Sequence, residues 1–402
     1  MSKPFEHMLT LSDAVSMTGP VRVSVMVKPV GAACPLACDY CYYRQHSSGK
    51  MSLELLERVV SEAFAANDGD DGVVFNWHGG EPLLAGLDFF REAVRLQRQY
   101  AGGRAFSNTL QTGGTLLDAA WASFFRDEHF LIGLSVDGPR DLHDRFRRDS
   151  SGGPTFDRVI RGLEWLRAFG VEFNTLSTVN AASEGRGKEV YRFLKGLGSR
   201  YMQFLPVSDP GRRENVSPRG FGQFMCDIFD DWVSRDVGKV FVNLFDATLA
   251  AWCGLTPGIC TACETCGGTA LVEHNGDVFP CDHCTEVRLG NIRELSLKEM
   301  VTSAAATRFS TGKRETLPAR CAGCPYRPLC GGECPAHRQA LPAASAPDAA
   351  ASVPNGTAAG ELLNSLCEGY RLFYSHTGPA MRTMRDLYLR GLPPSLIMST
   401  VP

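Results

Sequence analysis

Three cysteines near the amino terminus, Cys34, Cys38 and Cys41, are spaced so that one short loop can present three thiolates. Three thiolates can bind three irons of a cubane 4Fe–4S cluster, which leaves the fourth iron without a protein ligand. A structural zinc ion is the alternative, but such sites take four protein ligands. His46 is close, yet no fourth ligand stands nearby at a familiar spacing. The spacing therefore favours a cluster with one open iron.

A second, larger group of cysteines occupies the last third of the chain. The sequence has 15 cysteines, an odd number that argues against a set of disulfides. In a reducing compartment, clustered cysteines more often bind metal or carry out redox chemistry. Pairs spaced Cys-x2-Cys also suit a zinc ribbon, so zinc remains the main alternative for this region. The group comprises Cys253, Cys260, Cys263, Cys266, Cys281, Cys284, Cys321, Cys324, Cys330, Cys334 and Cys367.

Two further candidate sites follow predicted strands. Gly79 and Gly80 allow the backbone to approach a ligand closely, and the carboxylate of Glu81 can bind an amine. Ser135 lies at the end of a later strand, just before an Asp-Gly pair. A plain turn explains that pair equally well.

The segments that carry these residues alternate between strand and helix patterns. Alternating apolar residues predict a strand over Val21–Val30, and apolar residues at helical spacing follow the capping residue Ser52. Six strands alternating with helices imply parallel βαβ units in an α/β sheet. Because six units are fewer than the eight of a closed barrel, we predict an open, partial (β/α)6 barrel. The other predicted strands are 73–77, 105–110, 131–136, 172–179 and 201–207, and the later helices are 87–100, 119–125, 156–169 and 189–197.

Composition and charge limit the class of protein. The 402 residues are 44% hydrophobic and 21% charged, which is ordinary for a globular chain. A net charge of −3 provides no polybasic surface, so neither nucleic acid nor an anionic membrane is expected as a partner. The first residues lack the basic and apolar regions of a secretory signal. No stretch approaches the ~20 apolar residues of a membrane span, so we expect a cytoplasmic protein.

We predict four regions along the chain. Residues 1–20 are an amino-terminal extension, 21–245 the barrel, 246–385 the cysteine-rich domain and 386–402 a carboxyl-terminal tail. The cysteine-rich domain has little apolar core, so metal ligation must supply part of its folding free energy. Within it, residues 339–360 are rich in Ala, Pro and Ser, which predicts a flexible surface insertion.

The cysteine triad followed by Gly-Gly-Glu-Pro resembles the radical S-adenosylmethionine (SAM) superfamily. The resemblance implies that the amine and carboxylate of the methionyl group of SAM chelate the open iron. The reduced cluster then cleaves SAM to a 5′-deoxyadenosyl radical. Tyr40, just before the third cysteine, is expected to pack on the adenine. The other implied SAM contacts are Gly79, Gly80, Glu81, Ser135 and, for the carboxylate, Arg161.

The order of the later cysteines resembles the SPASM domain of radical SAM enzymes that modify peptides, an irregular domain with two auxiliary 4Fe–4S clusters. The resemblance implies that both auxiliary clusters are fully ligated, which suits electron transfer. The ligands implied are Cys260, Cys266, Cys281 and Cys334 for the first auxiliary cluster, and Cys321, Cys324, Cys330 and Cys367 for the second.

Asp282, directly after Cys281, has two possible roles. By the same resemblance it is the base that accepts the proton of a substrate hydroxyl or thiol. It could instead be only a turn residue or a hydrogen-bond acceptor beside a cluster ligand. The remaining cysteines are expected to be bystanders: Cys226, Cys253, Cys263 and Cys284.

From about Val25 to Tyr374 the chain is similar to anaerobic sulfatase-maturating enzymes, including stretches such as Lys28-Pro29. The similarity implies oxidation of a Cys or Ser in a Cys/Ser-x-Pro-x-Arg stretch of a sulfatase to formylglycine, by removal of a hydrogen atom from Cβ. It also implies an electron donor such as flavodoxin or ferredoxin. Tyr43 is a candidate wall of the peptide pocket, although simple packing explains it equally well.

The sequence departs from that family at two positions. Gly114 stands where the family usually has Asn, and His78 stands where many members have Gln. Both departures concern the substrate side of the site. An enzyme that crosslinks, epimerises or otherwise modifies a ribosomally made peptide is therefore the alternative, with the same clusters and the same use of SAM.

Overall fold

The protein is described by a computed structural model over residues 23–67, 72–340 and 362–399. The predicted extension at residues 1–20 and all but the first two residues of the predicted insertion at 339–360 lie outside these ranges. The six predicted strands form, and they pair in parallel in sequence order. They are β1 (Ser24–Lys28), β2 (Val73–Trp77), β3 (Phe106–Thr112), β4 (Leu131–Ser135), β5 (Phe173–Val179) and β6 (Tyr201–Pro206).

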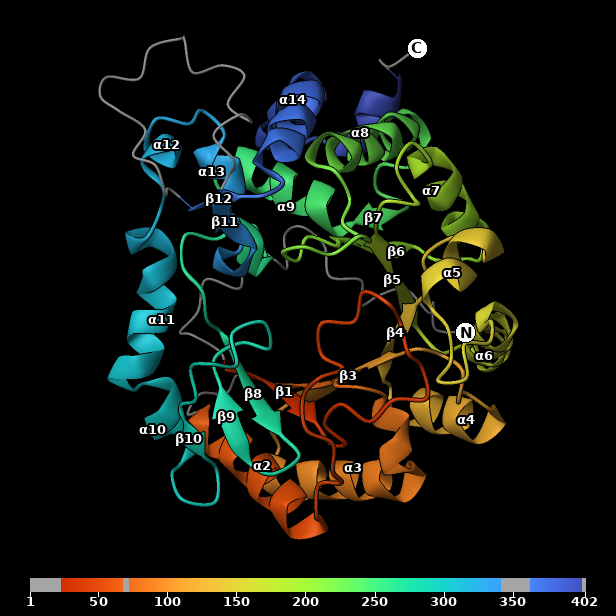
Figure 1. Ribbon diagram of the computed structural model, residues 1–402, viewed down its shortest axis with the longest axis vertical. Helices are drawn as coiled ribbons and strands as arrows, with labels where there is room; N and C mark the ends of the chain where they lie inside the picture. The colour runs from red at the N-terminus through yellow and green to blue at the C-terminus, as the bar shows by residue number, and fades with distance from the viewer. Residues whose placement is uncertain (1–22, 68–71, 341–361, 400–402) are drawn as a thin grey trace.

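Helices surround the outer face of this curved sheet (Figure 1). The strands form an open arc rather than a closed ring, which confirms the prediction of a partial barrel. The helices that follow the first six strands are α2 (Leu53–Ala66), α3 (Leu87–Ala101), α4 (Ala119–Asp127), α5 (Arg140–Phe146), α6 (Phe156–Phe169), α7 (Gly187–Gly196) and α8 (Pro218–Arg235), with a short 3-10 helix η1 (Pro82–Ala85).

The local sequence explains where helix α2 begins and which side it buries. The Ser52 side chain accepts a hydrogen bond from the backbone N–H of Leu55 at 3.2 Å, which satisfies one free donor of the first turn. Val59, Val60 and Phe64 lie on one face and are fully or almost fully buried against the sheet. Helical spacing of apolar residues thus places the helix against β1 and β2.

The sheet continues beyond the six barrel strands at both edges. Strand β8 (Thr269–Glu273), from the cysteine-rich region, pairs in parallel with β1 over five residues. Strands β9 (Asp277–Phe279) and β10 (Gly290–Asn291) add to it in antiparallel fashion. At the far edge β7 (Phe241–Val242) pairs in parallel with β6. The first hairpin of the cysteine-rich region is therefore part of the barrel sheet.

Two long helices close the other side of the arc. Helix α8 packs against α14 (Cys367–Leu389), and the two lie side by side at the top of Figure 1. At their crossing, a Cβ atom on Gly222 would come within 2.6 Å of the backbone oxygen of Gly369, so only glycine permits this approach. Residues Phe373 and Tyr374 of α14 are buried there. Neither helix was predicted from the sequence.

The remaining elements are short. None of the helices in the described ranges is long and apolar enough to cross a membrane. These elements are α9 (Asn243–Trp252), η2 (Cys260–Ala262), α10 (Leu297–Val301), α11 (Ala304–Glu315), α12 (Ala319–Ala322), α13 (Arg327–Cys330), η3 (Pro335–His337), β11 (Arg338–Ala340), β12 (Leu362–Asn364) and η4 (Pro394–Ser399).

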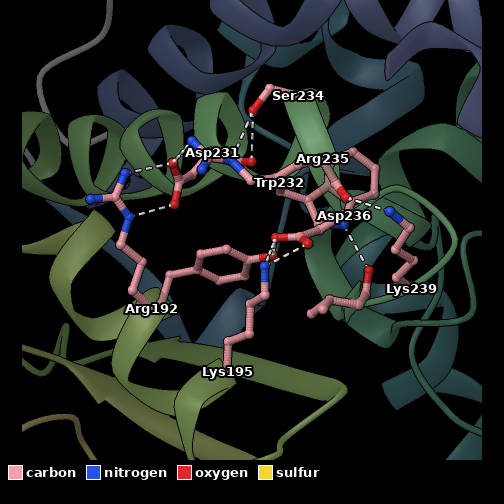
Figure 2. A network of polar contacts seen from close by, with 10 residues as sticks. Arg192, Lys195, Asp231, Trp232, Ser234, Arg235, Asp236 and Lys239 are labelled. Carbon is pink, nitrogen blue, oxygen red and sulfur yellow. Dashed lines mark hydrogen bonds and ion pairs between the residues drawn. The ribbon is translucent and has the colours of Figure 1, made fainter. Parts of the chain in front are cut away.

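A network of ion pairs fixes α7 to α8 (Figure 2). The carboxylate of Asp236 is almost fully buried and accepts hydrogen bonds from Lys195 Nζ at 2.6 and 2.7 Å. It also accepts one from the Tyr191 hydroxyl at 2.8 Å. One turn earlier, Asp231 accepts two hydrogen bonds from Arg192. The buried carboxylates are thus fully partnered, as low-polarity surroundings require.

We expect Asp236→Asn to lower the free energy of unfolding by about 1–3 kcal/mol, because Lys195 and Tyr191 lose a charged acceptor. Urea denaturation at constant iron content measures this. Arg98→Ala, which breaks an exposed ion pair with Glu128, is the control and should cost less than about 1 kcal/mol. Equal losses in the two variants would contradict the prediction.

Candidate functional site

A cavity of about 500 Å³ opens at the carboxyl ends of the barrel strands. Parallel α/β sheets bind ligands at this edge. Cys34, Cys38 and Cys41 all line the cavity from the loop after β1. The other predicted site residues that line it are Tyr40, Gly79, Gly80, Ser135 and Asp282, and Tyr43 lines it as well.

The loop that carries the three cysteines is held by backbone contacts. The N–H of Ala37 donates to the oxygen of Arg148 at 2.7 Å, and that of Asp39 donates to the oxygen of Phe146 at 3.1 Å. Burial, assisted by the charge of Glu81, raises the pKa of Cys34 to about 12. A thiol in such a place ionises when a metal cation binds it. Three thiols on one fixed loop fit a 4Fe–4S cluster with one open iron.

The two glycines after β2 also make room for this loop. A Cβ atom on Gly80 would lie 2.2 Å from the backbone oxygen of Ala33, inside the cysteine loop. Gly79 has a φ of +124°, which side-chain-bearing residues rarely adopt. The pair was predicted to let a ligand approach. In the structure Gly79 and Gly80 line the cavity. They also allow the end of β2 to pack against the cysteine loop.

Glu81 is fully enclosed and is not among the residues that line the cavity. Its carboxylate accepts hydrogen bonds from the Thr112 hydroxyl and the backbone N–H of Gly113, both at 2.9 Å. Burial raises its pKa to about 7, against the effect of these hydrogen bonds. In this structure Glu81 therefore fixes the turn after β3 beside the cavity. Contact with an amine remains a prediction.

A buried charge pair supports the cysteine loop from the side of β4. The Tyr40 hydroxyl donates to Asp137, whose other oxygen lies 3.1 Å from Nε of Arg147. The guanidinium of Arg147 also stands over the Tyr40 ring, at 5.4 Å from its centroid. Arg147 lines the cavity, but the sequence analysis did not single it out. A buried Asp137 requires a cationic partner, yet no spacing rule identifies which arginine provides it.

The two remaining predicted SAM contacts differ in position. Ser135 lines the cavity, and its hydroxyl accepts a hydrogen bond from Gln111 at 2.9 Å. Arg161 lies exposed on α6, and it is not among the residues that line the cavity. The structure therefore brings Ser135, but not Arg161, to the predicted site. Arg147 is the arginine that lines the cavity.

Asp282 enters the cavity from the loop after β9. One carboxylate oxygen accepts a hydrogen bond from the Tyr42 hydroxyl at 2.6 Å and lies 3.9 Å from Nζ of Lys28. Burial alone would raise the pKa of Asp282, but the charges of His283 and Lys28, with the hydrogen bond from Tyr42, outweigh burial and bring it to about 2. Asp282 is therefore ionised, and it stands within the same cavity as the three cysteines.

Histidines and a tyrosine around Asp282 were not predicted as site residues, although His78 was noted as a departure from the family pattern. The ring of His283 stacks on that of Tyr42, with 4.5 Å between centroids. His78 lines the cavity, and its Nδ1 accepts a hydrogen bond from the N–H of Gly79 at 2.8 Å. Burial lowers the pKa of His78 to about 4, so its ring is neutral and the proton is assigned to Nε2. The only signal in the sequence is that Tyr42 and His283 directly neighbour predicted site residues.

The four cysteines predicted for the second auxiliary cluster lie together. Cys321, Cys324, Cys330 and Cys367 line one small cavity, bounded also by aromatic residues of α14. Burial raises the pKa of Cys330 to about 12, with nearby Glu333 adding to the effect. Four half-buried thiols around one small cavity fit a fully ligated cluster.

The cysteines predicted for the first auxiliary cluster also interact. Burial raises the pKa of Cys334 to about 12, and the charges of Glu333, Cys281 and Cys260 contribute to this increase. Burial and the charge of Cys281 also raise the pKa of Cys266. Cys284, an expected bystander, hydrogen-bonds with Cys281, which raises the pKa of Cys284. Its thiol therefore lies beside a predicted ligand.

In the described ranges, no three Cys, His, Asp or Glu side chains converge closely enough to hold a single metal ion. A structural zinc ion requires four ligands around one point. The ligands of a cubane lie farther apart, because each binds a different iron.

Comparisons with known proteins agree with this arrangement. Residues 29–193 match the Radical SAM superfamily, and residues 261–325 match an iron–sulfur cluster-binding domain called SPASM. The chain is 38% identical to a serine-type anaerobic sulfatase-maturating enzyme of Bacteroides thetaiotaomicron, over 94% of each chain. It is 31% identical to a cysteine-type enzyme of Clostridium perfringens, over 89% of this chain and 97% of the relative.

Among solved structures, the chain is similar to anSMEcpe with bound AdoMet and the Cp18Cys peptide. The TM-score is 0.80 at 30% identity, over 90% of this chain and 99% of that one. The similarity in fold and sequence thus extends along nearly the whole length of the chain. The protein belongs to the anaerobic sulfatase-maturating enzymes of the radical SAM superfamily.

Proposed function

We propose that this protein binds SAM and oxidises a serine or cysteine of a sulfatase to formylglycine. The observation that carries the proposal is that three loop cysteines and an ionised Asp282 line one cavity. The cysteines come from the first loop of the barrel and Asp282 from the cysteine-rich region, so the fold brings a radical-generating site and a base together. The relatives that share this fold are sulfatase-maturating enzymes.

The chain supplies a site for SAM and for a cluster at the end of the barrel. When bound, these two cofactors provide a radical able to remove a hydrogen atom from an unactivated Cβ. The Tyr40 ring, the backbone of Gly79 and Gly80, and Ser135 are the residues proposed to hold SAM, since all four line the cavity. Arg147 is the cation in that cavity that can face the SAM carboxylate.

Asp282 is proposed to accept the proton of the substrate hydroxyl or thiol. Tyr42 and Lys28 both approach its Oδ2, which leaves Oδ1 for the substrate. Among described residues, Oδ1 has one long contact with the Cys281 thiol, at 3.9 Å. Loss of one hydrogen atom from Cβ, one proton from the side chain and one electron would convert serine to the aldehyde directly; the auxiliary cluster proposed at Cys260, Cys266, Cys281 and Cys334 would be the electron acceptor. Cysteine gives a thioaldehyde, which water hydrolyses to the same aldehyde.

Serine is the residue we propose as the preferred target. The chain shares 38% identity with the serine-type relative and 31% with the cysteine-type relative, each over most of its length. The proposed target stretch is Ser-x-Pro-x-Arg, with a reduced flavodoxin or ferredoxin as the source of electrons.

The reaction can be tested with anaerobically reconstituted protein, SAM, a reductant and two sulfatase-type peptides that differ only in Ser or Cys. We expect mass spectrometry to show loss of two hydrogens from the serine peptide. The cysteine peptide should give the same aldehyde more slowly. No product from either peptide would overturn the proposal and favour modification of a ribosomally made peptide.

Asp282→Asn should slow aldehyde formation by about 10²–10⁴-fold, the usual cost of removing a general base. SAM binding, measured by equilibrium dialysis, should be retained because Asp282 is not proposed to hold SAM. Asp88→Asn, at a carboxylate exposed on α3, is the control. A wild-type rate of product formation by Asp282→Asn would remove Asp282 from the mechanism.

Metal analysis tests the clusters independently of activity. Three 4Fe–4S clusters correspond to about twelve irons per chain and a brown protein. Replacing Cys34, Cys38 and Cys41 with alanine should remove about four of these irons. Bound zinc in place of iron, in a colourless reconstituted protein, would contradict the cluster assignment.

A further inference from the structure

Two lysines are buried in the described part of the chain, and they are satisfied in different ways. Lys313 on α11 donates hydrogen bonds from Nζ to the backbone oxygens of Cys260 and Thr261, both at 2.8 Å. Lys28, the last residue of β1, is fully buried, and its Nζ has no hydrogen-bond partner among the described residues. A buried ammonium without hydrogen bonds is costly. Structural stability alone does not explain Lys28.

The surroundings of Lys28 point to Asp282. Nζ lies 3.9 Å from the carboxylate of Asp282 and 3.3 Å from the centroid of the Tyr43 ring. An ammonium over an aromatic face is held by the electrostatic field of the ring. The Tyr43 hydroxyl in turn donates to Glu273 at 2.5 Å. The hydrogen bond to Glu273 thus fixes the Tyr43 ring, and the ring in turn holds the Lys28 ammonium.

Lys28 itself does not face the substrate. Tyr42, Tyr43 and Asp282 line the large cavity, whereas Lys28 is not among its lining residues. The side chain of Asp282 is 13% exposed and that of Lys28 is 0% exposed. The ammonium therefore approaches Oδ2 of the carboxylate without lining the cavity, and it can act on Asp282 through charge and position.

We propose that Lys28 is a positioning residue for the base, which holds the Asp282 carboxylate toward the substrate and balances its negative charge. This inference rests on the proposed function. It predicts that Lys28 matters for the step in which Asp282 takes part and not for SAM cleavage. Displacement of a catalytic group by about 1 Å can cost on the order of a hundredfold in rate.

The first test is Lys28→Met, with Lys28→Arg as the variant that keeps the charge. In Lys28→Met we expect deoxyadenosine to form from SAM at close to the wild-type rate, while the aldehyde formed per SAM cleaved falls about tenfold to a hundredfold. Lys28→Arg should recover part of this ratio. A parallel fall in SAM cleavage and aldehyde would overturn the inference.

Melting temperatures can distinguish a positioning role of Lys28 from a purely structural one. Replacing both partners of a buried ion pair leaves no uncompensated buried charge, which is what makes the loss of one partner alone destabilising. The Lys28→Met/Asp282→Asn double variant should therefore melt at or above the wild-type temperature. Lys313→Met is the matched control and should melt lower, because the oxygens of Cys260 and Thr261 lose their donor. A double variant that melts as low as Lys313→Met would show that Lys28 is structural.

A double-mutant cycle tests whether Lys28 acts through Asp282. In the Asp282→Asn background, Lys28→Met should not change the ratio of aldehyde to cleaved SAM any further. The same loss in both backgrounds would overturn the inference. If the wild-type protein forms no aldehyde, the proposed function fails and this inference fails with it. If it forms aldehyde and Lys28→Met leaves the ratio unchanged, only the inference fails.

Discussion

The backbone hydrogen bonds between β1 and β8 join two parts of the protein that are more than two hundred residues apart in sequence. Strand β1 ends in Lys28 and leads into the cysteine loop, while β8 ends in Glu273 and leads through β9 to Asp282. Parallel pairing lays β8 alongside β1, and the hairpin that β8 forms with antiparallel β9, which Asp282 follows, is thereby held beside β1. The meeting of Tyr42 with Asp282 depends on this pairing.

Local periodicity explains why much of the barrel could be predicted. Strand β2 and helix α6 were predicted at their observed bounds, because their apolar residues repeat with the period of each element. Helix α8 carried a start signal that was not used, since Ser217 caps it and Pro218 opens it. Helix α14 contains Pro379, which argues against a continuous helix of that length. The pairing of β8 with β1 is long-range, and no local pattern reveals it.

Site residues were easiest to single out where chemistry requires a residue type at a fixed spacing, as for the cysteines that line the two cavities. Residues that packing places in the site, without any spacing rule, were harder to predict. The charge on Arg147 is placed by the turn after α5 beside a buried Asp137, whereas Arg161 sits on the exposed face of α6. In the sequence, Lys28 is recognisable only as part of a Lys28-Pro29 stretch similar to the family. Its ion pair follows from the packing of two distant loops around it.

The position of Cys367 at the very start of α14 has a consequence for biosynthesis. Three of the four thiols around the second cysteine cavity are translated earlier, but the fourth arrives with the helix that must also dock on α8. The enclosure therefore cannot be completed on the ribosome while this helix is still in the exit tunnel. A cluster at this site, as the resemblance implies, would accordingly be completed only after Cys367 has emerged, and a nascent chain stalled before Cys367 would present three of the four thiols without the fourth.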